Sequence, residues 1–200
     1  MRVCIAVAGA SGAGKSSFAE RIRGAAVLSM DSYFLERSCV DYFMRDDWDT
    51  PAAYDMPLIS AHVEALLRGE RVAVPRFDFR SGCRSQGSAL SLVQGQSLVV
   101  EGLYAFDAVL AATHRIFIDV GYREMVARCF PRDQYERNRP FVDQLAAMYR
   151  RSWEKYTVHL FPQRMNADYV LPATWMSYFP AVIEQSRLAS VLAPWRRGQR

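Results

Sequence analysis

Gly9-Ala10-Ser11-Gly12-Ala13-Gly14-Lys15-Ser16 is the stretch that decides the fold, because its glycines, lysine and serine have the spacing G-x-x-x-x-G-K-S. The apolar residues 3–8 stand directly before it, and the helix-compatible residues 16–22 follow. A strand, a glycine-rich loop and a helix in this order form a P-loop, where backbone N–H groups and the positive helix end surround phosphate oxygens. A glycine-rich turn without a ligand would leave that order unexplained.

The residues of this loop predict binding of a nucleoside triphosphate. Lys15 would reach the β- and γ-phosphates and is a catalytic candidate, and the Ser16 hydroxyl would ligate Mg²⁺. The predicted cofactors are therefore ATP and Mg²⁺. The candidate nucleotide-binding residues in the loop are Gly9, Ala10, Ser11, Gly12, Ala13, Gly14, Lys15, Ser16 and Ser17.

Composition narrows the class of protein. The 200 residues suit one domain, and a net charge of +4 suits a polyphosphate ligand without requiring nucleic acid. The four cysteines lack the spacing of a zinc site or a disulfide framework. There is no signal-peptide pattern and no apolar segment near the roughly 20 residues that cross a bilayer. We therefore expect a cytoplasmic protein that binds neither nucleic acid nor membrane, and a homo-oligomer stays open.

Apolar strand patterns alternate with helical patterns, which predicts an α/β fold with a mainly parallel sheet and helices on both faces. We expect an extended arm over residues 70–79, paired with residues 89–93. Strands are expected near residues 2–8, 26–29, 97–101, 115–120 and 168–171. Helices are expected near residues 16–23, 57–67, 122–137, 141–159 and 180–192.

Two carboxylates follow predicted strands. Asp31 comes fifteen positions after Ser16, at the end of an apolar segment, and Glu101 ends residues 97–101. Ligands of doubly wound sheets bind where the strands end, so Asp31 could accept a proton from an attacking hydroxyl and Glu101 could support Mg²⁺. The alternatives are a turn aspartate and a surface glutamate.

Arginines gather later in the chain. Arg128, Arg132, Arg137 and Arg139 fall within twelve residues of one predicted helix. A solvated, salt-bridged helix face is one interpretation. Beside a P-loop, a lid that closes over the transferred phosphoryl group is the better one.

These features together resemble the uridine kinase and phosphoribulokinase family of P-loop kinases. The resemblance implies one kinase domain over residues 1–200, with a lid at about 122–140 and a substrate-side arm at about 70–95. It also implies transfer of the γ-phosphoryl group of ATP to a hydroxyl of a small sugar-like or nucleoside-like acceptor. The matching blocks are residues 9–16, 28–34, 48–55, 75–79, 100–106, 116–120, 132–139 and 167–172.

The resemblance also assigns roles to residues. It implies that Asp31 is the catalytic base and that Glu101 is associated with magnesium. Arg132 and Arg137 match catalytic lid arginines, and Arg139 matches one that contacts the nucleotide phosphates. Asp49 matches a carboxylate that holds ribose hydroxyls, which a carboxylate does by accepting two hydrogen bonds. The acceptor-site candidates are Asp49, Tyr33, Phe77, Arg76 and Trp48.

The chain departs from uridine kinases where they contact the pyrimidine. Phe77, Gly82 and Cys129 stand at those positions. Arg76 and Arg84 lead to the hypothesis of an anionic acceptor. Two other functions stay open: a P-loop ATPase or regulatory nucleotide-binding protein without a small-molecule acceptor, and a degenerate kinase that only binds nucleotide. The sequence does not identify the acceptor, the oligomeric state or the residues that hold the adenine.

Overall fold

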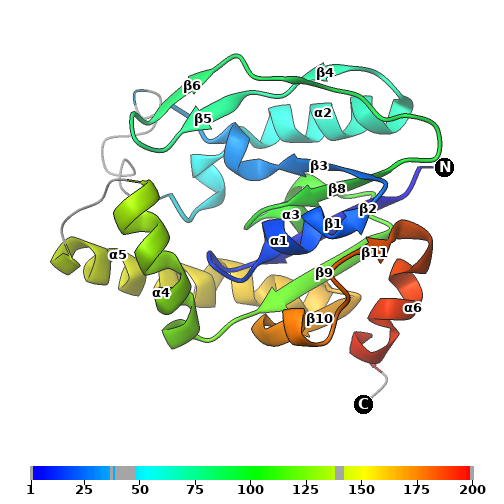
Figure 1. Ribbon diagram of the computed structural model, residues 1–200. Coiled ribbons are helices and arrows are strands. Elements are labelled where there is room, and N and C mark those ends of the chain that lie inside the picture. The colour runs from blue at the N-terminus through cyan, green and yellow to red at the C-terminus, as the bar shows by residue number, and fades with distance from the viewer. Residues whose placement is uncertain (1, 37, 39–47, 138–141, 199–200) are drawn as a thin grey trace.

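The computed structural model describes residues 2–36, 38, 48–137 and 142–198 (Figure 1). Its centre is a five-stranded parallel sheet in the order β10-β9-β1-β8-β3. This confirms the predicted α/β class, and every strand of the sheet lies close to its predicted position. The strands are β1 (Cys4–Gly9), β3 (Ala25–Ser29), β8 (Ser97–Glu101), β9 (His114–Asp119) and β10 (Tyr169–Pro172).

The two strands at the middle of the sheet explain why it forms. Every residue of β1 and β8 is buried. Because consecutive side chains of a strand point to opposite faces, burial without alternation means that both faces of the sheet are covered. Large side chains such as Ile5, Leu98 and Phe117 are at most 1% exposed, and removing such groups from water drives the assembly.

Helices cover the sheet and extend beyond it. In Figure 1, α2 lies above the sheet, and α4 and α5 lie close together at the lower left. The bounds of α2 follow from its caps: the carboxylate of Asp55 accepts from the Leu58 N–H, and Gly69 ends the helix at φ +96°. No helix in the described ranges is both long and apolar enough to span a bilayer. The helices are α1 (Lys15–Glu20), α2 (Met56–Arg68), α3 (Ala105–Ala108), α4 (Tyr122–Pro131), α5 (Val142–Lys155) and α6 (Leu188–Leu192).

Two predicted helices are shorter than the sequence indicated. The helix expected at residues 16–23 stops at Glu20, and the one expected at 180–192 begins only at Leu188. Both lose residues to the same feature, because β2 (Ile22–Arg23) pairs in parallel with β11 (Ile183–Glu184). Ile183 is buried as a strand residue, so tertiary pairing overrides its helical pattern.

The lid helix also changes character before its predicted end. Within α4, Pro131 has no N–H to donate to the preceding turn, which interrupts the hydrogen-bond ladder. The wider helical turn η4 (Arg132–Glu136) follows it. The helical hydrogen-bond pattern thus changes directly before Arg132.

The arm consists of two small antiparallel pairs. Strand β4 (Val72–Ala73) pairs with β7 (Ala89–Leu90), which confirms the predicted pairing of these segments. Strand β5 (Arg76–Asp78) pairs with β6 (Cys83–Ser85), a hairpin that the sequence analysis did not predict. The arm runs along the top of the molecule in Figure 1.

Candidate active site

The P-loop begins where β1 ends. Gly12 and Gly14 have φ angles of +71° and +93°, which glycine adopts at little cost, and α1 begins directly afterwards at Lys15. The Lys15 ammonium donates to the Ala10 carbonyl at 2.9 Å, inside the loop. Burial lowers the pKa of Lys15, and the nearby Glu101 and Asp31 act in the opposite direction. The loop therefore has the curled backbone and the partly buried cation that a phosphate chain requires.

Parallel register brings the two predicted carboxylates to the P-loop. Glu101 is level with Val7 of β1 and with Ser29 of β3, and Asp31 follows directly after β3. The Glu101 residue is only 4% exposed. Its Oε1 atom accepts a hydrogen bond from the Ser29 hydroxyl at 2.5 Å. Burial raises the pKa of Glu101, while Lys15 acts to lower it.

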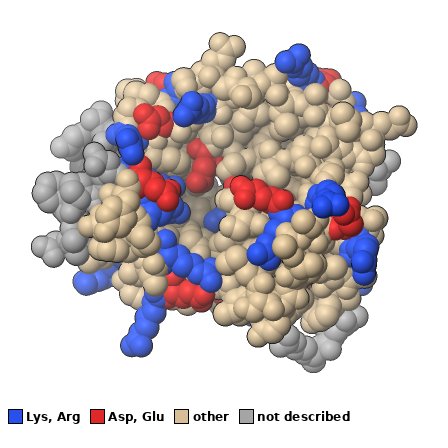
Figure 2. All heavy atoms as spheres, viewed as in Figure 1, with Lys and Arg blue, Asp and Glu red and all other residues tan. Residues whose placement is uncertain are grey.

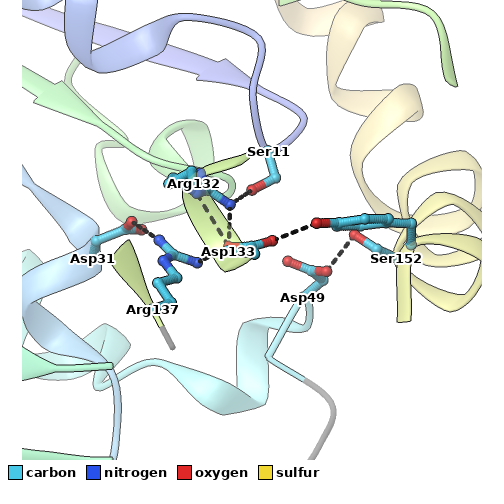
Figure 3. A network of polar contacts seen from close by, with 8 residues as sticks. Ser11, Asp31, Asp49, Arg132, Asp133, Arg137 and Ser152 are labelled. Atoms are coloured by element: carbon cyan, nitrogen blue, oxygen red, sulfur yellow. Dashed lines mark hydrogen bonds and ion pairs between the residues drawn. The ribbon is translucent and has the colours of Figure 1, made fainter. Parts of the chain in front are cut away.

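A buried carboxylate organises the lid arginines. Figure 3 shows Asp133 between Arg132 and Arg137. Asp133 Oδ1 lies 3.1 Å from Arg132 Nη2 and 3.4 Å from Arg137 Nη1. Its other oxygen accepts from the Tyr149 hydroxyl at 3.0 Å, and the residue is 1% exposed. Because Tyr149 belongs to α5, this network fixes the lid turn against α5.

The same arginines extend from Asp133 into the site. Arg132 Nη2 lies 3.4 Å from the Ser11 hydroxyl of the P-loop. Arg137 Nη2 lies 3.8 Å from Asp31 Oδ2, and its guanidinium lies over the Phe79 ring at 3.9 Å. Arg137 therefore joins the lid, the predicted base and the arm.

Asp49 is held at the opposite end of the site. Its carboxylate accepts from the Ser152 hydroxyl of α5, as Figure 3 shows, and its backbone carbonyl accepts from the Tyr104 hydroxyl at 2.8 Å. Aromatic rings surround this end: Phe34 stacks on Tyr54 with centroids 4.2 Å apart, and Trp48 lies edge-on to Phe34 at 5.6 Å. The wall beside Asp49 is therefore largely flat and apolar.

Most of these side chains line one cavity of about 430 Å³. Figure 2 shows a hollow on this face of the molecule, with acidic and basic side chains around it. Its phosphate end is formed by Ser11, Gly12, Gly14, Lys15, Ser16 and Ser17. Asp31, Glu101, Arg132 and Arg137 lie on its walls, and its far end is formed by Phe34, Trp48, Asp49, Tyr54, Phe79 and Ser152.

Some predicted site residues lie elsewhere. The Tyr33 side chain is buried, and its hydroxyl shares a hydrogen bond of 2.9 Å with His62 Nδ1. Phe77 packs behind Phe34 and Trp48 without lining the cavity, and Arg76 is exposed on the arm. Gly9, Ala10 and Ala13 support the P-loop from below the cavity surface. Arg139 lies outside the described residues.

The positions of Arg76 and Arg84 do not support the hypothesis that these two arginines bind an anionic acceptor. Arg84 Nη1 is bound to Asp55 Oδ2 at 2.9 Å, and neither Arg84 nor Arg76 lines the cavity. The charge of Arg84 is therefore already balanced within the fold.

Sequence reasoning missed several residues of the site. Arg128 stood in the arginine cluster without an assigned role, yet its guanidinium donates to the carbonyls of Gly12 at 3.2 Å and Ala173 at 3.0 Å. Asp133, Tyr149, Ser152 and Tyr54 were not assigned either. Helical spacing offered one signal, because Tyr149 and Ser152 stand three residues apart on α5 and both lie on its cavity side.

The residues present fit a magnesium nucleotide. A side chain on Gly12 would meet Cys129 Sγ at 2.9 Å, so the loop can pack this closely against α4 only because this position is glycine. The Ser16 hydroxyl acts to lower the pKa of Glu101, so the two groups lie close together, and both could hold Mg²⁺. Among the described residues, no three His, Cys, Asp or Glu side chains converge to hold a metal by themselves, which suits an ion bound chiefly through phosphates.

Comparison with known proteins identifies relatives over most of the chain. Residues 4–177 match the model of the phosphoribulokinase / uridine kinase family. A uridine kinase of Deinococcus deserti is 29% identical over 179 residues, covering 84% of this chain and 86% of the relative.

Two solved structures share the fold. A possible uridine kinase from Bacillus stearothermophilus is 14% identical with a TM-score of 0.56, covering 85% of this chain and 88% of that one. Phosphoribulokinase from Rhodobacter spheroides is 15% identical with a TM-score of 0.57, covering 86% and 70%.

Proposed function

Because the chain belongs to the phosphoribulokinase / uridine kinase family, we propose that it transfers the γ-phosphoryl group of ATP to a primary hydroxyl of a nucleoside-like acceptor. The observation that carries the proposal is a single cavity lined by Lys15, Asp31 and Asp49. A phosphate-binding cation, a proton acceptor and a group that can hold a diol thus face one space.

Asp31 is the proposed general base. The proton of the acceptor hydroxyl passes to its carboxylate as the new O–P bond forms and ADP leaves. The side chain of Asp31 is 46% exposed, so an incoming hydroxyl can reach it. Arg137 lies between Asp31 and Asp133, where its guanidinium can stabilise the negative charge that develops on the transferred phosphoryl group.

The nucleotide lies along the P-loop in this proposal, with Lys15 and Arg132 on its phosphates. Mg²⁺, held by Ser16 and supported by Glu101, supplies neutralisation of the phosphate charge. The adenine belongs at the cavity wall formed by Met125, Arg128 and Met176, since Met125 and Arg128 lie against Gly12 of the P-loop.

The acceptor end favours an uncharged molecule that combines a diol with a flat ring. Asp49 can accept hydrogen bonds from two vicinal hydroxyls, and Ser152 orients it. Phe34, Trp48 and Phe79 offer flat apolar surface for a ring. The name of the D. deserti relative, uridine kinase, supports a nucleoside.

Asp31→Asn tests the mechanism. We expect acceptor-dependent ADP release to fall by about 10²–10⁴-fold, the usual contribution of a general base, while ATP affinity is retained. Asp168→Asn is the control, because its carboxylate accepts from the Arg115 N–H at 2.7 Å outside the cavity. It should leave turnover unchanged.

A panel of acceptors tests the substrate class. Uridine, cytidine, nicotinamide riboside, pantothenate, glycerate and a sugar phosphate are supplied with MgATP, and ADP release is measured. We expect the nucleosides to give faster ADP release than pantothenate, glycerate and the sugar phosphate. ATP turnover that no acceptor increases would refute the kinase and indicate an ATPase or regulatory protein.

A further inference from the structure

The hydroxyl of Tyr54 is a buried polar group with no hydrogen-bond partner among the described residues. Tyr54 lines the acceptor end of the cavity together with Asp31 and Asp49, and only 3% of the residue is exposed. Buried hydroxyls are normally paired, because an unpaired one loses its bonds to water without replacement. An exception at a cavity wall suggests that a ligand supplies the missing partner.

Neighbouring tyrosines show what the usual arrangement is. The Tyr104 hydroxyl donates to the Asp49 carbonyl at 2.8 Å, and the Tyr33 hydroxyl shares a hydrogen bond of 2.9 Å with His62. Tyr54 stacks on Phe34 and lies edge-on to Tyr104, yet its own hydroxyl is left over. A phenylalanine would supply the same ring contacts, so the contacts made by the described part of the chain do not explain the oxygen.

The ring of Tyr54 is fixed in place. Phe34 and Tyr54 form an antiparallel backbone bridge, and their rings stack with an interplanar angle of 29°. The Tyr54 N–H donates to the Pro51 carbonyl at 3.1 Å. The hydroxyl is therefore presented by a rigid support, as a group that selects a substrate needs to be.

The charge around this hydroxyl keeps it a neutral donor. Burial raises the pKa of Tyr54 well above its ordinary value, and the carboxylates of Asp31 and Asp49 act in the same direction. The O–H proton thus stays on the oxygen throughout the working pH range. The same two carboxylates repel an anionic ligand oxygen, so the oxygen that best accepts from this O–H is an uncharged one.

We propose that Tyr54 is a specificity-determining residue whose hydroxyl donates a hydrogen bond to an uncharged oxygen of the acceptor other than the one phosphorylated. The proposal rests on the proposed function, since it requires an acceptor in this cavity. It selects for acceptors that carry a hydroxyl, ether or carbonyl oxygen near their ring, and against purely apolar rings.

Tyr54→Phe tests this inference, with Tyr156→Phe as the matched control. Tyr156 is also 3% exposed, but its hydroxyl donates to Asp119 at 2.9 Å, outside the cavity. For the best nucleoside of the panel, we expect Tyr54→Phe to lower kcat/KM by about tenfold or more with the KM for ATP unchanged. Its melting temperature should equal or exceed that of the wild type, whereas Tyr156→Phe should melt lower with kcat/KM unchanged.

Two results would overturn the proposal while the wild type is active. One is an unchanged kcat/KM for the acceptor in Tyr54→Phe. The other is a melting temperature of Tyr54→Phe lowered as far as that of Tyr156→Phe, which would reveal a partner within the fold. A wild type that phosphorylates no member of the panel would instead refute the proposed function, and this inference with it.

Discussion

Removing the charge of Asp133 should loosen the contact between the turn η4 and α5. In Asp133→Asn, Arg132 and Arg137 lose the carboxylate that lies 3.1 Å and 3.4 Å from them. Leaving buried charges without their partner lowers the free energy of unfolding by about 3–5 kcal/mol. The arginine side chains are 28% and 18% exposed, so water compensates in part and we expect the lower end, about 3 kcal/mol.

The expected effect is large enough to measure by thermal unfolding. For a chain of this size, about 3 kcal/mol corresponds to a melting temperature lowered by roughly 6–12 °C. Tyr149→Phe is the graded comparison, because it keeps the charge and removes one hydrogen bond to it, worth about 1.5–3 kcal/mol. Asp133→Asn should therefore be the less stable of the two variants.

Nucleotide binding gives the sharper test of Asp133. The phosphates of MgATP would supply negative charge to the same arginines, so MgATP should raise the melting temperature of Asp133→Asn by more than that of the wild type. The kcat should fall by about tenfold or more, because Arg137 loses its position. An Asp133→Asn variant with wild-type stability and wild-type kcat would refute the account of this network.

Three further predictions concern the phosphate end. Burial raises the pKa of Glu101, so the stability that its protonated carboxyl contributes is present at low pH and is lost as the pH rises through that raised pKa. Because Mg²⁺ needs the ionised carboxylate, the increase in melting temperature caused by MgATP should become larger over the same pH range. Glu101→Gln should abolish this pH dependence of the melting shift. Arg128→Ala should raise the KM for ATP about tenfold and leave the acceptor KM unchanged in steady-state kinetics, because the P-loop loses the guanidinium bound to its Gly12 carbonyl; an unchanged KM for ATP would contradict this. Gly12→Ala should abolish the MgATP melting shift, since the added Cβ would lie 2.9 Å from Cys129 Sγ. The double variant Gly12→Ala with Cys129→Ala should recover only part of this shift, because a φ of +71° still disfavours alanine by about 1 kcal/mol. Full MgATP binding by Gly12→Ala would exclude the steric argument.

The sequence predicted most where a residue's place depends on its immediate neighbours in the chain. The apolar residues 98–100 of β8 favoured a buried strand, which would bring its last residue, Glu101, to the edge of the sheet with the P-loop, as the structure confirms. Asp31 followed from the same rule at the end of β3. That the two lie at one cavity is confirmed, while their roles in catalysis stay predictions.

Residues whose place depends on distant contacts could not be predicted in this way. Ile183 has a helical pattern around it, and only its pairing with Ile22 makes it a strand. Ser152 reaches Asp49 across 103 positions of chain, a contact that spacing along α5 cannot reveal. The acceptor candidate Tyr33 faces His62 because a turn of η1 (Met30–Tyr33) directs it away from the cavity that Asp31 lines.

The β5–β6 hairpin forms a two-stranded sheet of its own, separate from the five parallel strands that carry the P-loop. Its contacts with the rest of the molecule include the rings of Phe77 and Phe79 against Phe34, the guanidinium of Arg137 over Phe79, and the Arg84–Asp55 ion pair. Because Phe79 lines the cavity while the P-loop belongs to the other sheet, we expect, under the proposed function, that mutations in this hairpin change the choice of acceptor more than they change nucleotide binding. One ancestral parallel sheet could in this way give rise to proteins with many different acceptor preferences. Grafting hairpins between relatives is a practical route to new acceptor preferences.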